Sequence, residues 1–161
     1  MDISRIRALR GPNLWSRNTA VEAIVACANH ERSLSSLPGF EARLRALFPS
    51  LGPFRRQPEQ VSLAHVLEAA TLALQTQAGC PVSFSRTTET VDSGTYQVVV
   101  EYTEEDVGRK ALAAAERLIE AALLPDGSFD AEQAIADLRE LDEDVRLGPS
   151  TGAIVNAALA R

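Results

Sequence analysis

SLAHVLEAATLALQTQAG, residues 62–79, predicts a helix that other elements cover on most of its sides. Ser62 is a good N-cap, Gly79 suits the left-handed position after a helix, and Pro81 prevents continuation. Two apolar stripes at helical spacing leave little polar surface between these ends. The first stripe contains Leu63, Leu67, Ala70, Leu74 and Ala78, and the second contains Val66, Ala70 and Ala73.

His65 and Glu68 are the chemical groups of this helix, because a spacing of three places them on one face. Residues 65–69, HVLEA, match the first His and the Glu of the inverted zinc-protease pattern H-x-x-E-H, but Ala69 stands at the position of its second His. In that pattern two His residues bind one zinc ion and the Glu acts as base for the metal-bound water. One His and one Glu do not complete such a site, and His30, the other His of the chain, falls in a predicted loop. We therefore expect a vestigial metal motif in which His65 is hydrogen-bonded to Glu68, with no catalytic residue and no bound metal.

The composition is that of one soluble globular domain over residues 1–161, with 45% hydrophobic and 24% charged residues. No apolar run is long enough for a membrane span, so no membrane partner is expected. Cys27 and Cys80 lack metal-binding spacing and are predicted to be small core residues in a reducing, cytoplasmic compartment.

The net charge of −6 conceals an asymmetry, because residues 1–80 carry +3 and residues 81–161 carry −9. Fifteen of the sixteen basic residues are Arg, whose planar guanidinium suits the binding of carboxylates, and the acidic half would in turn suit guanidinium groups. The chain has no basic stripe with interleaved aromatic residues. Nucleic acid is therefore not an expected partner.

Residues 82–90 and 95–103 are the best strand candidates, and Asp92, Ser93 and Gly94 between them give a hairpin turn signal. The second run, TYQVVVEYT, is apolar enough for a central strand. Residues 19–28 fit either a helix or a strand, because their β-branched residues also fall at helical spacing.

The other segments predict an edge strand, loops and four further helices. Residues 2–9 are the predicted edge strand, residues 30–39 a mobile polar loop and residues 49–58 a proline-rich loop. Helices are expected at 40–48, at 104–124, at 131–144 with Asp130 as N-cap, and at 151–161. Turn residues at 125–127 and 147–150 separate the last three of these helices. The last helix is still apolar at its end, which predicts one domain of a longer protein.

Ser85, Arg86, Thr88 and Glu89 form a second candidate site within the first strand of the hairpin. A strand end rich in hydroxyl groups, with one Arg and one Glu, could hold a zwitterionic ligand through paired hydrogen bonds. The alternative is a solvated hairpin tip with a surface ion pair. Without a glycine-rich phosphate loop or a Ser or Cys beside a base, neither ATP binding nor nucleophilic catalysis is expected.

Five separated stretches resemble the N-terminal domain of cyanophycin synthetase, in that family's order and along nearly the whole chain. They are LRGPNLWS at 9–16, the helix from 65 to 79 followed by CPV, FSRTTET at 84–90, GTYQVVVEY at 94–102 and LGPST at 147–151. The resemblance implies that residues 19–28 form a strand. It also implies an α+β fold, with a mixed or antiparallel sheet of about four strands packed against several α-helices.

This family resemblance implies an ATP-dependent bacterial ligase that adds aspartate to a poly-aspartate backbone and arginine to its side chains. The ATP-grasp and Mur-ligase-like domains that use ATP and Mg are absent from this sequence, so no cofactor is expected. The N-terminal domain of the family is understood to hold the growing polymer near the ligase sites. In some members it also carries a zinc-dependent hydrolytic site, built on H-x-x-E-H, that trims the polymer into primers.

The sequence departs from that hydrolytic pattern at two positions of the helix. Ala69 replaces the second His, and Ala73 stands where such members have a further acidic residue. The hydrolytic role is therefore not expected here. Arg86, Thr88 and Glu89 do match the family's motif, and polymer contact is expected at and around them.

The sequence thus predicts a non-catalytic domain that binds the cyanophycin polymer. Its other expected partners are the remaining domains of the same enzyme and further copies in a cytoplasmic homo-oligomer. Two alternatives stay open: a zinc-dependent hydrolytic domain with an unrecognised third ligand, and a scaffold that only packs against neighbouring domains or protomers.

Overall fold

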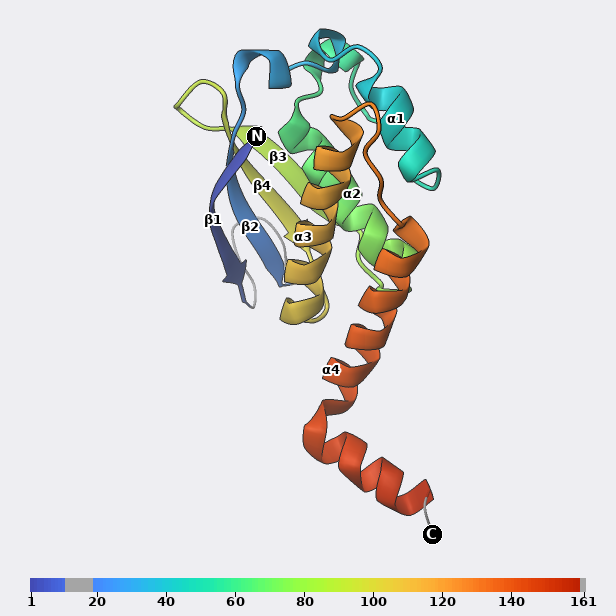
Figure 1. The fold of residues 1–161 in the computed structure, drawn as a ribbon. Helices are drawn as coiled ribbons and strands as arrows, with labels where there is room; N and C mark the ends of the chain where they lie inside the picture. Colours follow the sequence, from blue (N-terminus) through green and yellow to red (C-terminus); the bar gives the residue numbers. More distant parts are fainter. Residues whose placement is uncertain (11–18, 160–161) are drawn as a thin grey trace.

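A four-stranded antiparallel sheet with helices packed on one of its faces forms the domain (Figure 1). The computed structural model describes the backbone of residues 1–10 and 19–159, and the side chains of residues 1–10 and 19–146. The strands are β1 (Asp2–Leu9), β2 (Ala20–Ala26), β3 (Ser85–Glu89) and β4 (Thr95–Glu101), in the spatial order β1-β2-β4-β3. The predicted α+β class and antiparallel sheet are therefore confirmed.

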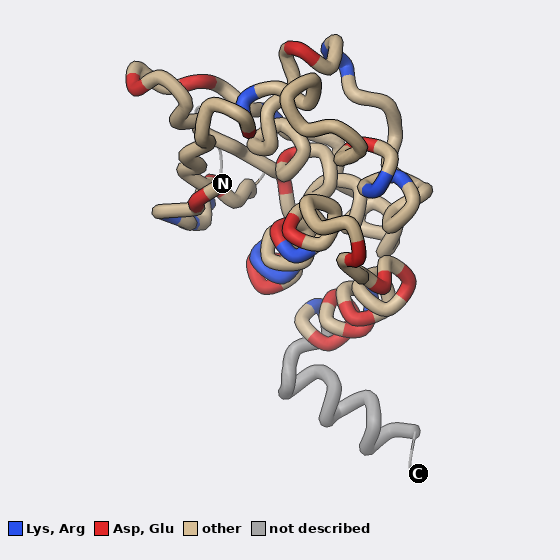
Figure 2. The backbone as a smooth tube through the Cα atoms, turned by 45° about the horizontal axis from the view of Figure 1, so that its top comes forward, with Lys and Arg blue, Asp and Glu red and all other residues tan. Residues whose placement is uncertain are grey.

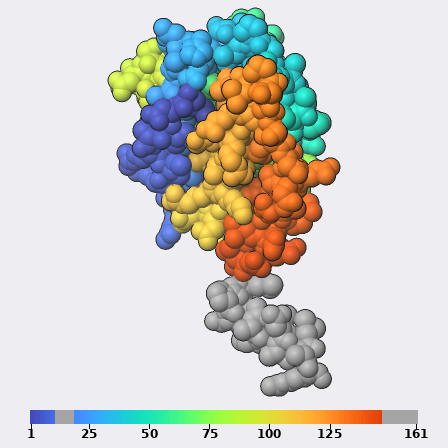
Figure 3. Space-filling view, viewed as in Figure 1, coloured from blue at the N-terminus to red at the C-terminus, as the bar shows by residue number. Residues whose placement is uncertain are grey.

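Within the described residues four α-helices accompany the sheet, and α2 and α3 lie directly against it. The helices are α1 (Phe40–Leu47), α2 (Leu63–Gln77), α3 (Glu105–Ala122) and α4 (Ala131–Leu159), with short 3-10 helices at Asn29–Glu31, Leu34–Ser36 and Pro58–Gln60. The first part of α4 packs beside α3, as the space-filling view shows (Figure 3). Most acidic residues of the C-terminal half lie on these two helices (Figure 2). No described helix is both long and apolar enough to cross a membrane.

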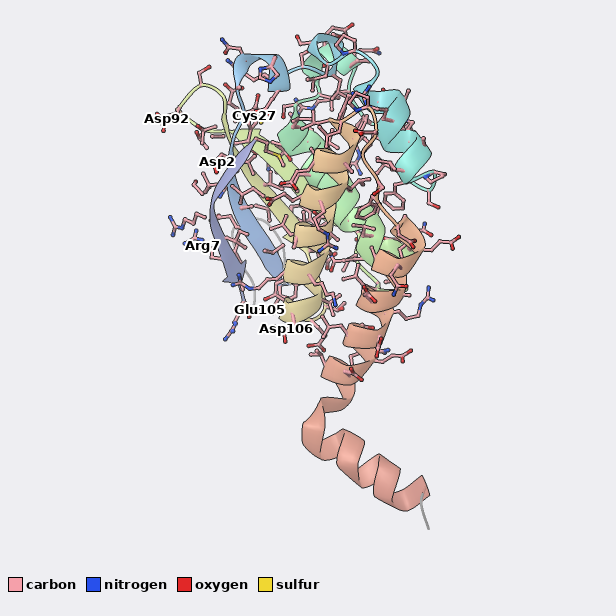
Figure 4. All side chains as sticks on the ribbon, viewed as in Figure 1. Asp2, Arg7, Cys27, Asp92, Glu105 and Asp106 are labelled. Atoms are coloured by element: carbon pink, nitrogen blue, oxygen red, sulfur yellow. The ribbon has the colours of Figure 1, made fainter. Side chains whose placement is uncertain are left out.

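The strand register gives the sheet one apolar face. Val21, Ala23 and Val25 of β2 lie opposite Val100, Val98 and Tyr96 of β4, and all six side chains belong to the buried core. Because successive side chains of a strand point to opposite faces, the residues between them lie on the face away from the helices. Glu22 is one of these, and it accepts hydrogen bonds there from Arg7 at 2.6 Å and from Gln97 at 2.6 Å. Arg7 extends from β1 on the side away from the helices (Figure 4).

Helix α2 begins and ends as its sequence predicts. The Ser62 hydroxyl accepts from the backbone N–H of His65, and His65 Nδ1 accepts from the backbone N–H of Ser62 at 3.1 Å. This reciprocal pair is a capping box with His in the place of the usual Glu or Gln. At the other end Gly79 has a φ of +94°, and the N–H of Cys80 reaches the carbonyl of Gln75 at 3.0 Å. These are the bonds of a Schellman motif, which ends the helix.

Other sequence predictions are also confirmed. Residues 2–9 form an edge strand, residues 20–26 form a strand as the family resemblance implies, and β4 is central. Asp92 lies at the turn between β3 and β4 (Figure 4), where Gly94 has a φ of +82°. Asp130 caps α4 by accepting from the N–H of Gln133 at 3.0 Å. Cys80 is buried and Cys27 half-buried, both as free thiols.

Two predictions about the chain path are wrong. Residues 30–39 contain short 3-10 helices, and Leu34 among them belongs to the core, so this segment is anchored by apolar burial. The predicted turn at 147–150 and the separate helix at 151–161 are replaced by a single α4 that continues to Leu159. A proline inside a helix removes one backbone hydrogen bond and kinks the helix without necessarily ending it. The ribbon of α4 changes direction in this part (Figure 1).

Gly127, between α3 and α4, permits a close approach of two backbone segments. A Cβ added there would lie 1.9 Å from the carbonyl oxygen of Ala121. We predict that Gly127→Ala lowers the free energy of unfolding by about 2 kcal/mol, because the backbone must shift to relieve this contact. Urea denaturation measures the effect. Gly52→Ala, where an added Cβ meets nothing within 4 Å, is the control and should be near neutral; equal losses in both variants would contradict the prediction.

His65 should make stability depend on pH between 7 and 5. Burial lowers the pKa of His65, with a further lowering by Arg56, so the fold favours the neutral imidazole. The unfolded chain binds this proton more readily, near pH 6.5. Stability that is present above that pH is therefore lost as the pH falls toward the folded-state pKa, by at most about 1.4 kcal/mol per pH unit.

We predict that His65→Gln, which keeps an acceptor for the capping box, removes this part of the pH dependence. The measurement is urea denaturation of both proteins from pH 7 to pH 5. The stability of wild type relative to the variant should fall over that range. A difference that stays constant with pH would contradict the assignment, and His30→Gln at an exposed position controls for loss of an imidazole elsewhere.

Candidate functional site

A cavity of about 990 Å³ lies between α2, β3 and the loop of residues 50–61. Residues 29, 32 and 33 and the buried Tyr96 of β4 complete its walls. Both candidate sites of the sequence, the His65–Glu68 pair and the strand residues 85–89, line this cavity. The structure therefore brings together into one site two groups that the sequence presented separately.

Helix α2 contributes one face to the cavity over most of its length. The lining residues recur at helical spacing and are His65, Glu68, Ala69, Leu72, Ala73, Thr76 and Gln77. At 1.5 Å per residue, the helix wall from the first to the last of these is about 18 Å long. The opposite face carries Leu63, Leu67, Ala70 and Leu74, all fully buried. The second predicted apolar stripe is thus split, since Val66 and Ala70 lie in the core and Ala73 lies on the cavity wall.

Glu68 is held by two hydroxyl groups of β3. Ser85 Oγ donates to Glu68 Oε2 at 2.7 Å, and Thr87 Oγ1 donates to Oε1 at 2.6 Å. Residues 85 and 87 can act together because alternate residues of a strand point to the same face. The predicted hydrogen bond between His65 and Glu68 is wrong, because β3 supplies better-placed donors to this carboxylate.

The imidazole of His65 is used at the start of α2. Its Nδ1 lies 2.8 Å from Ser62 Oγ and accepts from the Ser62 backbone N–H, so the neutral ring carries its proton on Nε2. The ring also meets Tyr96 edge-on, with the ring centroids 5.7 Å apart. Burial and Arg56 lower the pKa of His65, while Glu68 and Glu89 oppose this. These contacts give His65 a structural role at the N-terminus of α2.

The four residues predicted to bind a ligand, Ser85, Arg86, Thr88 and Glu89, all line the cavity. Their side chains do not share one face, since alternation directs residues 86 and 88 away from residues 85 and 89. Arg86 and Glu89 therefore cannot grip a ligand from the same side of the strand. Glu89 instead pairs with Arg32 at 3.2 Å and accepts from the N–H of Gly94 at 3.3 Å.

Several cavity residues were not among the predicted ligand-binding residues. Thr87 belongs to the same hydroxyl-rich strand run and could have been selected, because it stands two residues from Ser85 and so shares its face. Arg55 and Arg56 come from the proline-rich loop, where no periodic pattern indicates in which direction a side chain points. Both are exposed, and neither forms an ion pair within the part of the chain that the structure describes. The cavity thus presents cations from the loop and a carboxylate from α2.

The residues present do not fit a zinc site of the H-x-x-E-H type. Ala69 has no donor atom, and His65 Nδ1 accepts from the Ser62 N–H, which leaves the ring proton on Nε2 and no free ring nitrogen to bind a metal. Across residues 1–10 and 19–146 no group of three or more His, Cys, Asp or Glu side chains is placed to hold a metal ion. Among its chemical groups the site has two exposed guanidinium groups, an oriented carboxylate and an apolar wall.

Comparison with known proteins gives one consistent result. Residues 23–124 match the model of the cyanophycin synthase-like N-terminal domain. The whole chain is 38% identical, over 178 aligned positions, to cyanophycin synthetase of Trichormus variabilis, and covers 20% of that protein. The chain is 35% identical to cyanophycin synthetase of Geminocystis herdmanii and 34% identical to that of Crocosphaera subtropica, and it covers 20% of each of these proteins.

The chain spans about a fifth of the length of these relatives, and the family match covers β3, β4 and α2, which build the cavity. The chain belongs to the cyanophycin synthase-like N-terminal domain family.

Proposed function

We propose that this domain binds the growing cyanophycin polymer and holds it for ligase domains elsewhere in the same enzyme, without catalysing a reaction itself. The observation that carries the proposal is the cavity between α2 and β3, which both positive and negative side chains line. The polymer implied by the family presents one guanidinium and one carboxylate in each repeat. A site with both kinds of charge complements such a ligand on both counts.

The shape of the cavity supports an extended ligand. Its α2 wall runs for about 18 Å. An extended peptide backbone advances about 3.3–3.6 Å per residue, so roughly five residues of a poly-aspartate backbone fit along that wall. Several repeats would then be in contact at once.

Contact with several repeats is needed because each one is weak. Exposed ion pairs contribute about 0.2–1 kcal/mol, and Arg55 and Arg56 are exposed. Linked repeats gain from effective concentration, since the second contact becomes intramolecular once the first has formed. A long polymer would be retained while single repeats exchange freely, which suits a domain that must release and rebind a growing chain.

The proposal assigns the remaining roles outside this domain. ATP and Mg would be used by the ligase domains, and the domain would work in a cytoplasmic homo-oligomer of the complete enzyme.

The two rival functions make different predictions. A hydrolytic domain would hold zinc and shorten the polymer, and a scaffold would bind neither zinc nor polymer.

We predict that binding strengthens with oligomer length and weakens with salt. Isothermal titration of the 161-residue chain with synthetic oligomers of one, three and six β-Asp-Arg repeats measures this at low and high ionic strength. The dissociation constant should fall steeply between one and three repeats, because the longer oligomer spans the α2 wall. An affinity independent of length and salt would contradict the proposal, as would shortening of the oligomers by protein containing stoichiometric zinc.

We further predict that Arg55→Ala with Arg56→Ala weakens binding of the six-repeat oligomer about tenfold, because two exposed cations of the cavity are lost. The salt dependence should decrease as well. Arg117→Ala, which removes an exposed Arg of α3 outside the cavity, is the matched control and should bind as wild type does. A scaffold would show no difference between the double variant and the control.

A further inference from the structure

Glu68 is a half-buried carboxylate on the wall of the cavity, and its two hydrogen bonds come from neutral groups. Within the described residues no Lys, Arg or His nitrogen lies within ion-pair distance of it. A partly buried carboxylate is stabilised most by a cation that also donates hydrogen bonds. The cavity wall therefore carries an oriented negative charge that has no cationic partner among the described residues.

The two hydroxyl groups leave a defined pattern of free acceptor positions. Ser85 binds one oxygen and Thr87 binds the other, at 2.7 and 2.6 Å. Each carboxylate oxygen has two lone pairs, so one acceptor position remains on each. A carboxylate with one free acceptor position on each oxygen can accept two N–H groups of one guanidinium, whereas an ammonium acts as a single point charge.

The surface next to Glu68 suits the rest of an arginine side chain. Ala69, Leu72 and Ala73 continue the α2 wall as partly buried apolar residues. Arginine has an aliphatic stem that packs on apolar surface while its head group reaches a polar partner. The small side chains at positions 69 and 73 leave room for such a stem beside the helix.

The geometry points to a guanidinium-binding subsite, in which Glu68, oriented by Ser85 and Thr87, receives an arginine side chain of the ligand, with Ala69, Leu72 and Ala73 as its apolar floor. The identification of that arginine as part of the polymer rests on the proposed function, whereas the subsite itself rests on the contacts of this chain. Glu68 is thus the residue that selects arginine over uncharged or ammonium-bearing side chains.

The test compares two dipeptides that differ only in charge at the side-chain head. β-Asp-Arg and β-Asp-citrulline are titrated into the 161-residue chain by NMR, with EDTA present to exclude metal-mediated binding. Wild type should bind the Arg dipeptide on the order of tenfold more tightly, because citrulline keeps the shape but loses the charge-assisted hydrogen bonds. β-Asp-Lys should fall between them, because an ammonium engages one acceptor position well.

In Glu68→Gln this preference for arginine should disappear. The matched control is Glu120→Gln, which removes an exposed carboxylate of α3 outside the cavity and should keep the preference. Thermal denaturation checks that both variants fold. Ser85→Ala with Thr87→Val keeps the charge of Glu68 but frees its orientation, so this variant should lose part of the preference. An arginine preference in Glu68→Gln equal to that of wild type would overturn the subsite.

His65 gives a second readout that a purely structural role of Glu68 would not produce. The charged groups that act on the pKa of its imidazole are Arg56 from the loop, Glu68 from α2 and Glu89 from β3. A guanidinium on Glu68 would cancel a charge that now raises this pKa, so the Arg dipeptide should lower it and the citrulline dipeptide should not. Equal shifts with both dipeptides would count against the subsite.

The outcomes separate this inference from the proposed function. If long oligomers bind equally well to wild type and Glu68→Gln, and the arginine preference survives in the variant, the subsite is wrong and polymer binding stands. If the Arg dipeptide binds through Glu68 but long oligomers gain nothing in affinity, the subsite stands and polymer retention is wrong. Failure of every ligand to bind overturns both.

Discussion

The packing of α2 against the sheet is the constraint on which the rest of the structure depends. Leu63, Leu67 and Leu74 are fully buried on one side of this helix, and the capping box and the Schellman motif fix its ends. Burial of this apolar side sets the rotation of the helix about its axis. The residues on the other side, from His65 to Gln77, must then line a cavity. The position of every cavity-lining side chain of α2 thus follows from the core.

The parts of the fold that could be predicted from the sequence are those with strong local signals. The ends of α2, the turn at Gly94 and the cap at Asp130 each use a residue whose chemistry or backbone freedom favours that position. The strand at residues 20–26 needed the family resemblance, because its apolar residues fit both periodicities. Pro149 alone did not predict the course of α4, since a proline inside a helical pattern either kinks or ends the helix.

The sequence identified several residues that line the cavity, but it did not show which side chains pair with which. All four strand residues and the His65–Glu68 pair line one cavity. Helical spacing shows that residues 65 and 68 are neighbours, but the partner of each depends on elements distant in sequence. Glu68 is bound by β3, and His65 is bound by the residue that caps its own helix. Loop arginines such as Arg55 and Arg56 have no periodic pattern, so only the tertiary structure relates them to the site.

The alanine at position 69 shapes what this face of α2 can do. An imidazole at position 69 would fill part of the cavity wall next to Glu68. With alanine there, the two oxygens are oriented by hydroxyl groups, and the wall beside them is apolar. A carboxylate in that setting favours a cation with its own hydrogen-bond donors over bare solvent. Alanine at position 69 therefore leaves apolar space beside the Glu68 carboxylate, as the proposed guanidinium subsite requires.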